Sequence, residues 1–178
     1  MSAAAIWFQR ADRAERRLCM LANGVAKRRL PRGLFRLVSR LGDGVFWYGV
    51  IASMPLWLGP AGVQVSLQML LTGAVGWAAY RALKRKLVRE RPFVGLVGIE
   101  CAMPPLDRYS FPSGHTLHAV CFTLLAIDHV PGLALVLVPF ATLVALSRVV
   151  LGLHYPTDVA AGAALGAALA TLSETLAG

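Results

Sequence analysis

Three short clusters of charged and polar residues lie within an otherwise apolar stretch of the chain. The first is the basic run 84–92, the second is Pro-Ser-Gly-His at 112–115, and the third extends over 147–158. Each cluster lies at the end of a long hydrophobic segment. If those segments are helices that cross a membrane, the clusters meet at one membrane face, where they can bind a phosphate group.

The first cluster offers two cations seven residues apart, Lys84 and Arg91. A continuous helix, predicted to run to about Glu90, places them on one face, since Pro92 pushes the residue before it out of the α region. Lys84 supplies a compact charge and Arg91 a planar set of donors, and both match phosphate oxygens. Basic runs that flank membrane spans are common, so this cluster alone is weak evidence for a site.

The second cluster has the composition of a helix start that binds an anion. Ser113 is a good N-cap, and Gly114 lets the backbone approach a ligand closely. Free amides at a helix N-terminus bind anions, and His115 would lie beside such an anion, with a pKa suited to proton transfer. A capped helix with an interfacial histidine explains this motif equally well. His118, one turn further, is best explained as an ordinary hydrogen-bonded helical histidine.

The third cluster is the most specific, because Arg148, His154 and Asp158 follow at fixed spacings. Arg148 ends a hydrophobic segment and can bind phosphate through two donors. Asp158 falls in the first turn of the next helix, where the helix dipole favours a carboxylate. It can reach back to His154, and an imidazole oriented by a carboxylate presents its other nitrogen as a nucleophile.

These motifs, Lys84-x6-Arg91-Pro92, Pro112-Ser113-Gly114-His115 and Ser147-Arg148-x5-His154-x3-Asp158, resemble the three signature motifs of the type 2 phosphatidic acid phosphatase superfamily. That superfamily also includes vanadium haloperoxidases and glucose-6-phosphatases. All three motifs match in order at every signature position. The N-terminal region departs from the pattern, because many members have six spans and residues 1–42 look interfacial here.

The resemblance implies a role for each site residue. It implies that His154 attacks phosphorus to form a phosphohistidine, that Asp158 orients His154, and that His115 protonates the leaving group. The phosphate oxygens would be held by Lys84, Arg91, Ser113, the Gly114 amide and Arg148. We expect no metal and no cofactor, because these cations already neutralise the developing charge.

The composition favours an integral membrane protein. Of the 178 residues, 57% are hydrophobic and 15% are charged, against about 25% charged in an average soluble domain. The formal net charge is +9, but the basic residues lie between apolar spans and no nucleic-acid module is recognisable, so a nucleic-acid partner is not expected. Three widely spaced cysteines predict neither a disulfide framework nor a metal site.

The apolar segments predict an all-α, multi-pass transmembrane bundle of about five spans: 44–58, 61–80, 113–130, 133–153 and 156–176. Pro139 predicts a kink, and Gly162 and Gly166 predict close helix packing. We divide the chain into an interfacial region, 1–42, and a phosphatase core, 43–178. Asp128 and His129 are expected at the opposite membrane face.

Residues 3–30 are predicted to form a basic amphipathic helix, ended by Pro31, that lies on anionic lipid headgroups. Its apolar face carries Trp7, Ala11, Ala14, Leu18, Leu21 and Val25, while Arg10 and further basic residues lie elsewhere. A surface helix packed on the bundle is the alternative. Since the basic residues gather in 1–42 and 81–90, the positive-inside rule places the site at the cytoplasmic face of the inner membrane and the C-terminus outside.

We therefore expect a membrane phosphatase that acts on a lipid phosphate or diphosphate, such as phosphatidic acid, phosphatidylglycerol phosphate or a polyprenyl diphosphate. A phosphatase of a soluble phosphate ester stays open as an alternative. A vanadate-dependent oxidase and a non-catalytic membrane scaffold are disfavoured, the first by the lipid-embedded spans and the second by the complete set of reactive residues. The sequence does not determine the oligomeric state, and a homo-oligomer is one of the alternatives.

Overall fold

The structure, a computed structural model that describes residues 3–177, is built from helices. Within those residues it contains α1 (Ala3–Val25), α2 (Arg29–Leu41), α3 (Val45–Leu58), α4 (Ala61–Lys86), α5 (Pro92–Gly95), α6 (Gly114–His129), the 3₁₀ turn η1 (Pro131–Leu133), α7 (Ala134–Val150) and α8 (Pro156–Ala177). No strand occurs in that part of the chain, so the prediction of an all-α architecture is confirmed.

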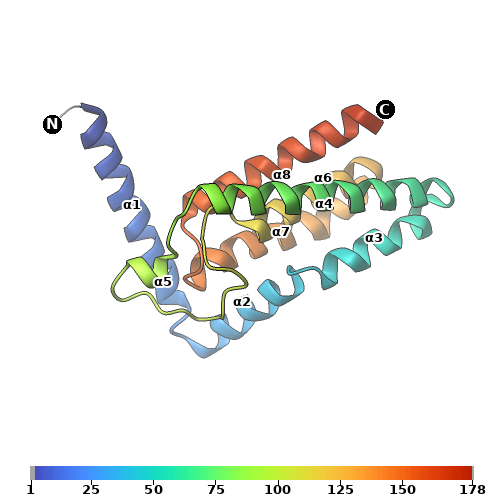
Figure 1. Cartoon of the computed structure of the whole chain (residues 1–178). Coiled ribbons are helices and arrows are strands. Elements are labelled where there is room, and N and C mark those ends of the chain that lie inside the picture. The colour runs from blue at the N-terminus through green and yellow to red at the C-terminus, as the bar shows by residue number, and fades with distance from the viewer. Residues whose placement is uncertain (1–2, 178) are drawn as a thin grey trace.

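Helices α3, α4, α6, α7 and α8 lie side by side as an elongated bundle, and α1 projects from one end of it at an angle (Figure 1). The short turns at 59–60 and 131–133 lie at the far end of the bundle. The other end holds α5 and the loop that precedes α6 (Figure 1). The three polar clusters therefore gather at a single end of the bundle.

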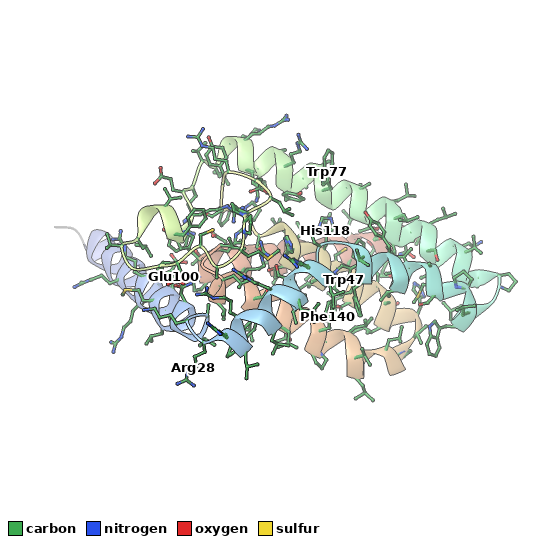
Figure 2. All side chains as sticks on the ribbon, turned by 90° about the horizontal axis from the view of Figure 1, so that it is seen from below. Arg28, Trp47, Trp77, Glu100, His118 and Phe140 are labelled. Carbon is green, nitrogen blue, oxygen red and sulfur yellow. The ribbon has the colours of Figure 1, made fainter. Side chains whose placement is uncertain are left out.

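The core that aligns these helices is apolar and closely packed. Trp47 of α3, Met69 of α4, Leu125 of α6 and Val144 of α7 are all buried within it. Trp47 also contacts Phe140, with ring centroids 5.6 Å apart (Figure 2). This packing holds together the helices whose ends carry the polar clusters.

The α6–α8 pair packs through its backbones, as the small residues of α8 predict. A Cβ atom on Gly162 would lie 2.4 Å from the Ser113 carbonyl oxygen, and one on Gly166 would lie 2.3 Å from that of Leu117. Only glycine allows this approach. The Ser113 N–H also donates to the Asp158 carbonyl oxygen at 3.0 Å, which ties the starts of the two helices together.

Two helical segments of the described chain, Pro131–Val150 and Pro156–Ala177, are long and apolar enough to cross a membrane by length and composition. Val45–Leu58 is a shorter apolar helix. The other predicted spans also fall on helices, α4 and α6. The number of spans stays a prediction.

The N-terminal helix ends earlier than predicted. The break lies at residues 26–28, and Pro31 falls in the first turn of α2, where proline is tolerated. Leu18, Leu21 and Val25 of the predicted apolar face are exposed, whereas Glu15, Cys19 and Asn23 of the same helix are buried. The predictions for Trp7, Arg10 and Ala11 concern side chains outside the described ones, which begin at residue 13.

The prediction that α4 continues to about Glu90 is wrong, because α4 ends at Lys86. Lys84 and Arg91 are therefore not on one continuous helix. Residues 87–91 are pulled into tertiary contacts instead. The Ser110 N–H donates to the Arg89 carbonyl oxygen at 2.9 Å, and Arg91 takes an extended conformation ahead of Pro92.

Candidate active site

The end of the bundle that holds the polar clusters contains a partly open cavity of about 810 Å³. It extends from the ends of α4, α6 and α7 and the turn before α8 along α3 and α4. Six of the eight predicted site residues line it, namely Lys84, Arg91, Gly114, His115, Arg148 and His154. The other two, Ser113 and Asp158, are buried behind its wall. The structure thus brings all three clusters to one place.

His154 lies in a tight turn between α7 and α8. Gly152 has a φ of 76°, which favours glycine, and this turns the chain back on itself. The Leu153 and His154 amides then both donate to the Arg148 carbonyl oxygen at 3.0 Å. The turn fixes the backbone of His154 directly after the helix that carries Arg148.

The environment of His154 keeps its imidazole neutral. Burial, followed by the charges of Arg148 and Arg91, lowers the pKa of His154 well below 6.5. Its Nε2 atom lies 3.3 Å from Nη1 of Arg91, which can only donate. Nε2 must therefore carry the lone pair, and the ring proton is on Nδ1. A neutral imidazole that carries its lone pair on Nε2, facing the cavity, is the form that can act as a nucleophile.

Asp158 lies behind His154 and is fully buried. Its Oδ2 accepts a hydrogen bond from the Tyr155 N–H at 2.8 Å and lies 3.6 Å from Nδ1 of His154. That separation is an ion-pair distance and exceeds a hydrogen bond. The predicted partnership is thus present as a close contact, with Nδ1 itself lacking a hydrogen bond in the described structure.

His115 faces a carboxylate that the sequence analysis missed. Its Nε2 lies 3.4 Å from Oδ1 of Asp43, in the turn between α2 and α3. Burial raises the pKa of Asp43, and the Arg148 charge partly offsets this effect. A carboxyl group beside His115 provides a partner for a protonated imidazole, as a general acid requires.

Arg148 is buried and retains an unused donor. Its Nη1 donates to Oγ of Ser39, a buried residue of α2, while its Nε has no hydrogen-bond partner in the described structure. An unsatisfied donor on a buried cation is costly unless a ligand completes it. Arg148 is therefore well prepared to bind an anion in the cavity.

Lys84 and Arg91 converge on one carboxylate, that of Asp107 in the loop before α6. The Lys84 ammonium lies 2.7 Å from both carboxylate oxygens, and Arg91 Nη2 donates to Oδ1 at 2.6 Å. Arg91 also donates to the carbonyl oxygens of Asp107 and Leu153. Asp107 and a bound phosphate would compete for the same donors.

The second cluster is arranged as predicted for a helix start. Ser113 is the N-cap of α6, and its Oγ accepts from the Thr116 N–H at 3.4 Å. Because Oγ serves this cap and is buried, it does not face the cavity. Gly114 does line the cavity, and a Cβ atom there would lie 3.2 Å from the Tyr80 ring.

His118 lines the same cavity, in the middle of the bundle (Figure 2). Its Nδ1 lies 3.0 Å from the Gly114 carbonyl oxygen and its Nε2 lies 3.1 Å from that of Gly73. Both partners are carbonyl oxygens, which only accept, so a neutral ring donates to one of the two. This agrees with the prediction of an ordinary hydrogen-bonded histidine.

Asp43, Asp107 and Ser39 were missed for a common reason. None belongs to a spaced motif, and each comes from a segment remote in sequence from the group that it contacts. Buried cations need anionic partners, so the excess of cations in the clusters was the signal that carboxylates must lie nearby. It did not indicate which carboxylates these are.

We expect Asp107→Asn to lower the stability of the protein at neutral pH, by on the order of 1–2 kcal/mol for a charged pair partly screened by solvent. Burial alone would raise the pKa of Asp107, but Lys84, with Arg91, holds that pKa below its usual value. The contribution is therefore present above pH ~4 and is lost as the pH falls through the lower folded pKa. Thermal unfolding in detergent, followed by circular dichroism at pH 7 and at pH 3–4, measures it.

The difference between wild type and Asp107→Asn should accordingly shrink at acidic pH. Asp128→Asn, which removes an exposed carboxylate at the other end of the bundle, is the control. A difference that is absent at pH 7, or that is unchanged at low pH, would show that Asp107 does not stabilise the paired cations.

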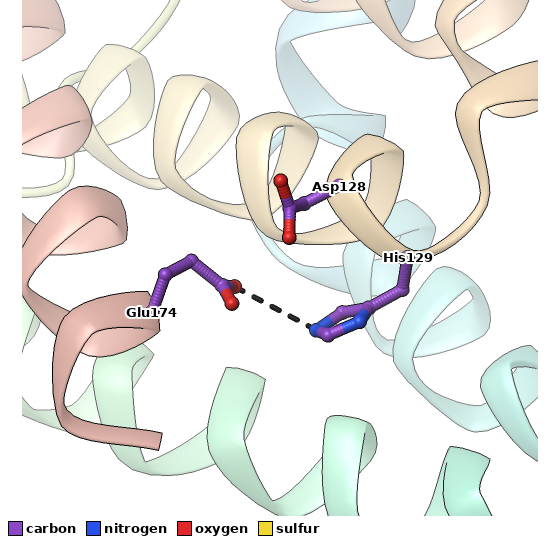
Figure 3. A group of neighbouring side chains, drawn as sticks. All are labelled: Asp128, His129 and Glu174. Atoms are coloured by element: carbon purple, nitrogen blue, oxygen red, sulfur yellow. Dashed lines mark ion pairs between the residues drawn. The ribbon is translucent and has the colours of Figure 1, made fainter. Parts of the chain in front are cut away.

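At that other end, Asp128 and His129 lie beside Glu174 of α8 (Figure 3). His129 Nε2 is 3.6 Å from Oε1 of Glu174, and one ligand atom from each residue lies within 4.8 Å of the others. This separation from the cavity agrees with the prediction that Asp128 and His129 take no part in the site.

The sequence is similar to those of known bacterial phosphatases. It is 36% identical over 116 residues to a decaprenylphosphoryl-5-phosphoribose phosphatase of Mycobacterium tuberculosis (strain CDC 1551 / Oshkosh), a match that covers 62% of each chain. It is 32% identical over 145 residues to phosphatidylglycerophosphatase B of Bacillus subtilis (strain 168), which covers 75% of this chain and 62% of the relative. The chain thus matches less than two thirds of the length of these relatives.

The fold is similar to two solved structures. A transmembrane PAP2-type phosphatidylglycerolphosphate phosphatase from Bacillus subtilis superposes with a TM-score of 0.75 at 25% identity, over 98% of this chain and 89% of the other. Aquifex aeolicus LpxE superposes with a TM-score of 0.76 at 24% identity, over 89% of this chain and 93% of the other. Residues 61–176 match the family described as the PAP2 superfamily. Since this match spans more than half of the chain and includes all three clusters around the cavity, the protein belongs to the PAP2 superfamily.

Proposed function

We propose that this protein is an integral membrane phosphatase that hydrolyses lipid phosphates or diphosphates through a phosphohistidine on His154. The observation that carries the proposal is the two-part character of the cavity. One end presents His115, Arg148 and His154, and the other is lined by apolar side chains of α3 and α4, including Ile51, Leu70 and Trp77. A headgroup phosphate and an acyl or prenyl chain fit these two ends.

In the proposed reaction, Nε2 of His154 attacks phosphorus, and the bond from phosphorus to the leaving oxygen breaks. His115 donates the proton that the leaving oxygen needs, with Asp43 as its partner. Asp158 stabilises the positive charge that develops on His154. Water then gives a proton to His115 and attacks the phosphohistidine, the bond from phosphorus to Nε2 breaks, and inorganic phosphate and the free imidazole are released.

The phosphate oxygens are held by the cations that face the cavity. Arg148 contributes its unused Nε, and the free amides at the start of α6 contribute through Gly114. Lys84 and Arg91 take part once phosphate competes with Asp107 for their donors. Since three cations already neutralise the developing charge, the proposed mechanism needs no divalent metal.

The substrate class rests on the apolar part of the cavity and on the names of the relatives. One relative is named for a decaprenylphosphoryl substrate and another for phosphatidylglycerophosphate. Both substrates are phosphate esters on a long hydrocarbon carrier. We therefore propose a prenyl-linked or glycerolipid phosphate as the substrate.

The proposed membrane arrangement has five spans, α3, α4, α6, α7 and α8, which form a core over 43–178. Residues 1–42 lie on the cytoplasmic surface of the inner membrane, with the active site at the same face. Leu30, Leu34 and Leu37 of α2 are exposed, as are Leu18 and Leu21 of α1, and basic residues alternate with them. Such helices can insert their apolar side chains into the interface while their cations contact anionic headgroups.

The test is phosphate release by the detergent-solubilised protein from a panel that includes phosphatidic acid, phosphatidylglycerol phosphate, a polyprenyl diphosphate and a soluble sugar phosphate. We expect release from at least one lipid in the presence of EDTA, and much slower release from the sugar phosphate. Activity only on the sugar phosphate would overturn the lipid assignment. An absolute requirement for Mg²⁺ would overturn the metal-independent mechanism.

A further inference from the structure

Arg89 belongs to the same basic run as Lys84 and Arg91 but does not share their role. It is not among the described residues that line the cavity. Its guanidinium lies on the other side of the wall, 3.9 Å from the centroid of the Tyr155 ring. This stacking places its donors toward the start of α8, where Asp158 lies.

Arg89 fixes the outer oxygen of the Asp158 carboxylate. Nη1 of Arg89 donates to Oδ1 of Asp158 at 2.6 Å, and the carboxylate is fully buried. The other oxygen, Oδ2, accepts from the Tyr155 N–H and faces His154. A buried carboxylate without a charged partner is costly and tends to take up a proton. The ion pair with Arg89 thus keeps Asp158 charged and holds Oδ2 toward His154.

Helix α1 in turn holds Arg89. Oε2 of Glu15 accepts from Nη2 of Arg89 at 2.7 Å, and the Glu15 side chain is only 10% exposed. Oε1 of Glu15 accepts from both the N–H and the hydroxyl group of Thr157, in the first turn of α8. Nη1 of Arg89 also donates to that hydroxyl group at 2.7 Å. The guanidinium is therefore clamped between Glu15 and Asp158.

We propose that Arg89, clamped by Glu15 of α1, is a positioning residue that holds the Asp158 carboxylate behind the nucleophile His154. The proposal rests on the proposed function, and it gives α1 a part in catalysis as well as at the lipid surface. Arg89 touches no reacting atom, so it acts only through Asp158.

Two consequences distinguish this role from a general contribution to folding. Because Arg89 does not face the cavity, its loss should change kcat and leave KM nearly unchanged. Because it acts through Asp158, its loss should have little further effect once Asp158 is already replaced. If Arg89 only stabilised the fold, the separate losses of kcat caused by replacing Arg89 and by replacing Asp158 would multiply in the double variant.

The experiment is a double-mutant cycle on kcat with Arg89→Met, Asp158→Asn and the variant that carries both, assayed on the best lipid of the panel. We expect Arg89→Met to lower kcat by roughly 10–100-fold, as is typical of groups that support a reactive ligand from behind. KM should stay within about twofold, and the double variant should match Asp158→Asn alone. Arg89→Lys, which keeps the charge, should recover part of kcat, and Glu15→Gln should lower kcat severalfold.

Arg32→Met is the matched control, since it breaks another pair between an arginine and a glutamate, Arg32 with Glu100, away from the cavity. It should retain wild-type kcat. Effects of Arg89→Met and Asp158→Asn that multiply, or a change confined to KM, would overturn the positioning role and leave the proposed function intact. No turnover by the wild-type protein on any lipid would overturn the proposed function and the positioning role together. Each variant is first checked for wild-type elution on size exclusion, and if Arg89→Met fails this check, Arg89→Lys and Glu15→Gln decide.

Discussion

Replacing His154 with alanine is expected to lower phosphate release by about 10⁴-fold or more on every substrate that the protein accepts. The imidazole is buried at the end of the cavity, is held neutral, and presents Nε2 toward the cations. Steady-state phosphate release by purified His154→Ala in detergent measures the effect.

His129→Ala is the control, because it removes a histidine at the opposite end of the bundle and should leave turnover unchanged. The fold of His154→Ala can be checked independently by size exclusion and thermal unfolding. A folded His154→Ala variant that retained turnover within tenfold of wild type would remove His154 as the nucleophile.

Replacing His115 with asparagine is expected to give the second largest loss, of roughly 10²–10⁴-fold, with an alkyl or prenyl phosphate as substrate. Such leaving groups are poor and need a proton as the bond to phosphorus breaks. An aryl phosphate with an acidic leaving group needs that proton far less. His115→Asn should therefore lose much less activity on p-nitrophenyl phosphate than on the lipid.

The loss of activity of His115→Asn on the lipid, divided by its loss on p-nitrophenyl phosphate, separates proton donation from phosphate binding. Arg148→Lys is the matched comparison, since Arg148 is proposed to bind the phosphate itself. It should slow both substrates by a similar factor. Equal losses on both substrates for His115→Asn would assign His115 to phosphate binding or to structure, and not to proton donation.

The sequence predicted most of the residues that line the cavity, but few of the contacts between them. The predicted spans 133–153 and 156–176 placed His154 in a turn between two helices, and the structure has this turn. This worked because the pattern is local and a proline and a glycine constrain the turn. The start of α6 was predicted for the same reason, since Ser113 is a local cap.

The position of Arg91 relative to Lys84 was not predictable from helix spacing. Residues 87–91 leave the helix because Arg89 pairs with Glu15 and Asp158 and because their backbone accepts hydrogen bonds from Ser110. Each of these partners is more than 15 residues away in the sequence. Long-range ion pairs of this kind override local propensity, and single-sequence patterns do not contain them. The contacts of Asp107 and Asp43 were missed for the same physical reason.

The role of the N-terminal region also depends on long-range contacts. Its basic, amphipathic pattern indicated a lipid surface, with a surface helix packed on the bundle as the alternative. The structure adds Ser39, which accepts from Arg148, and Glu15, which contacts Arg89 and Thr157. Both side chains are buried, although polar residues in an interfacial helix are expected to face water.

The proposed mechanism requires a covalent bond between phosphorus and His154. It is tested most directly by mixing the protein with a ³²P-labelled lipid phosphate, quenching with alkali within milliseconds to seconds, and mapping the labelled peptide by mass spectrometry. We predict label on the peptide that contains His154, stable to base, labile to acid and absent from His154→Ala. Turnover without any labelled protein, or stable label on another residue, would show that His154 is not the nucleophile.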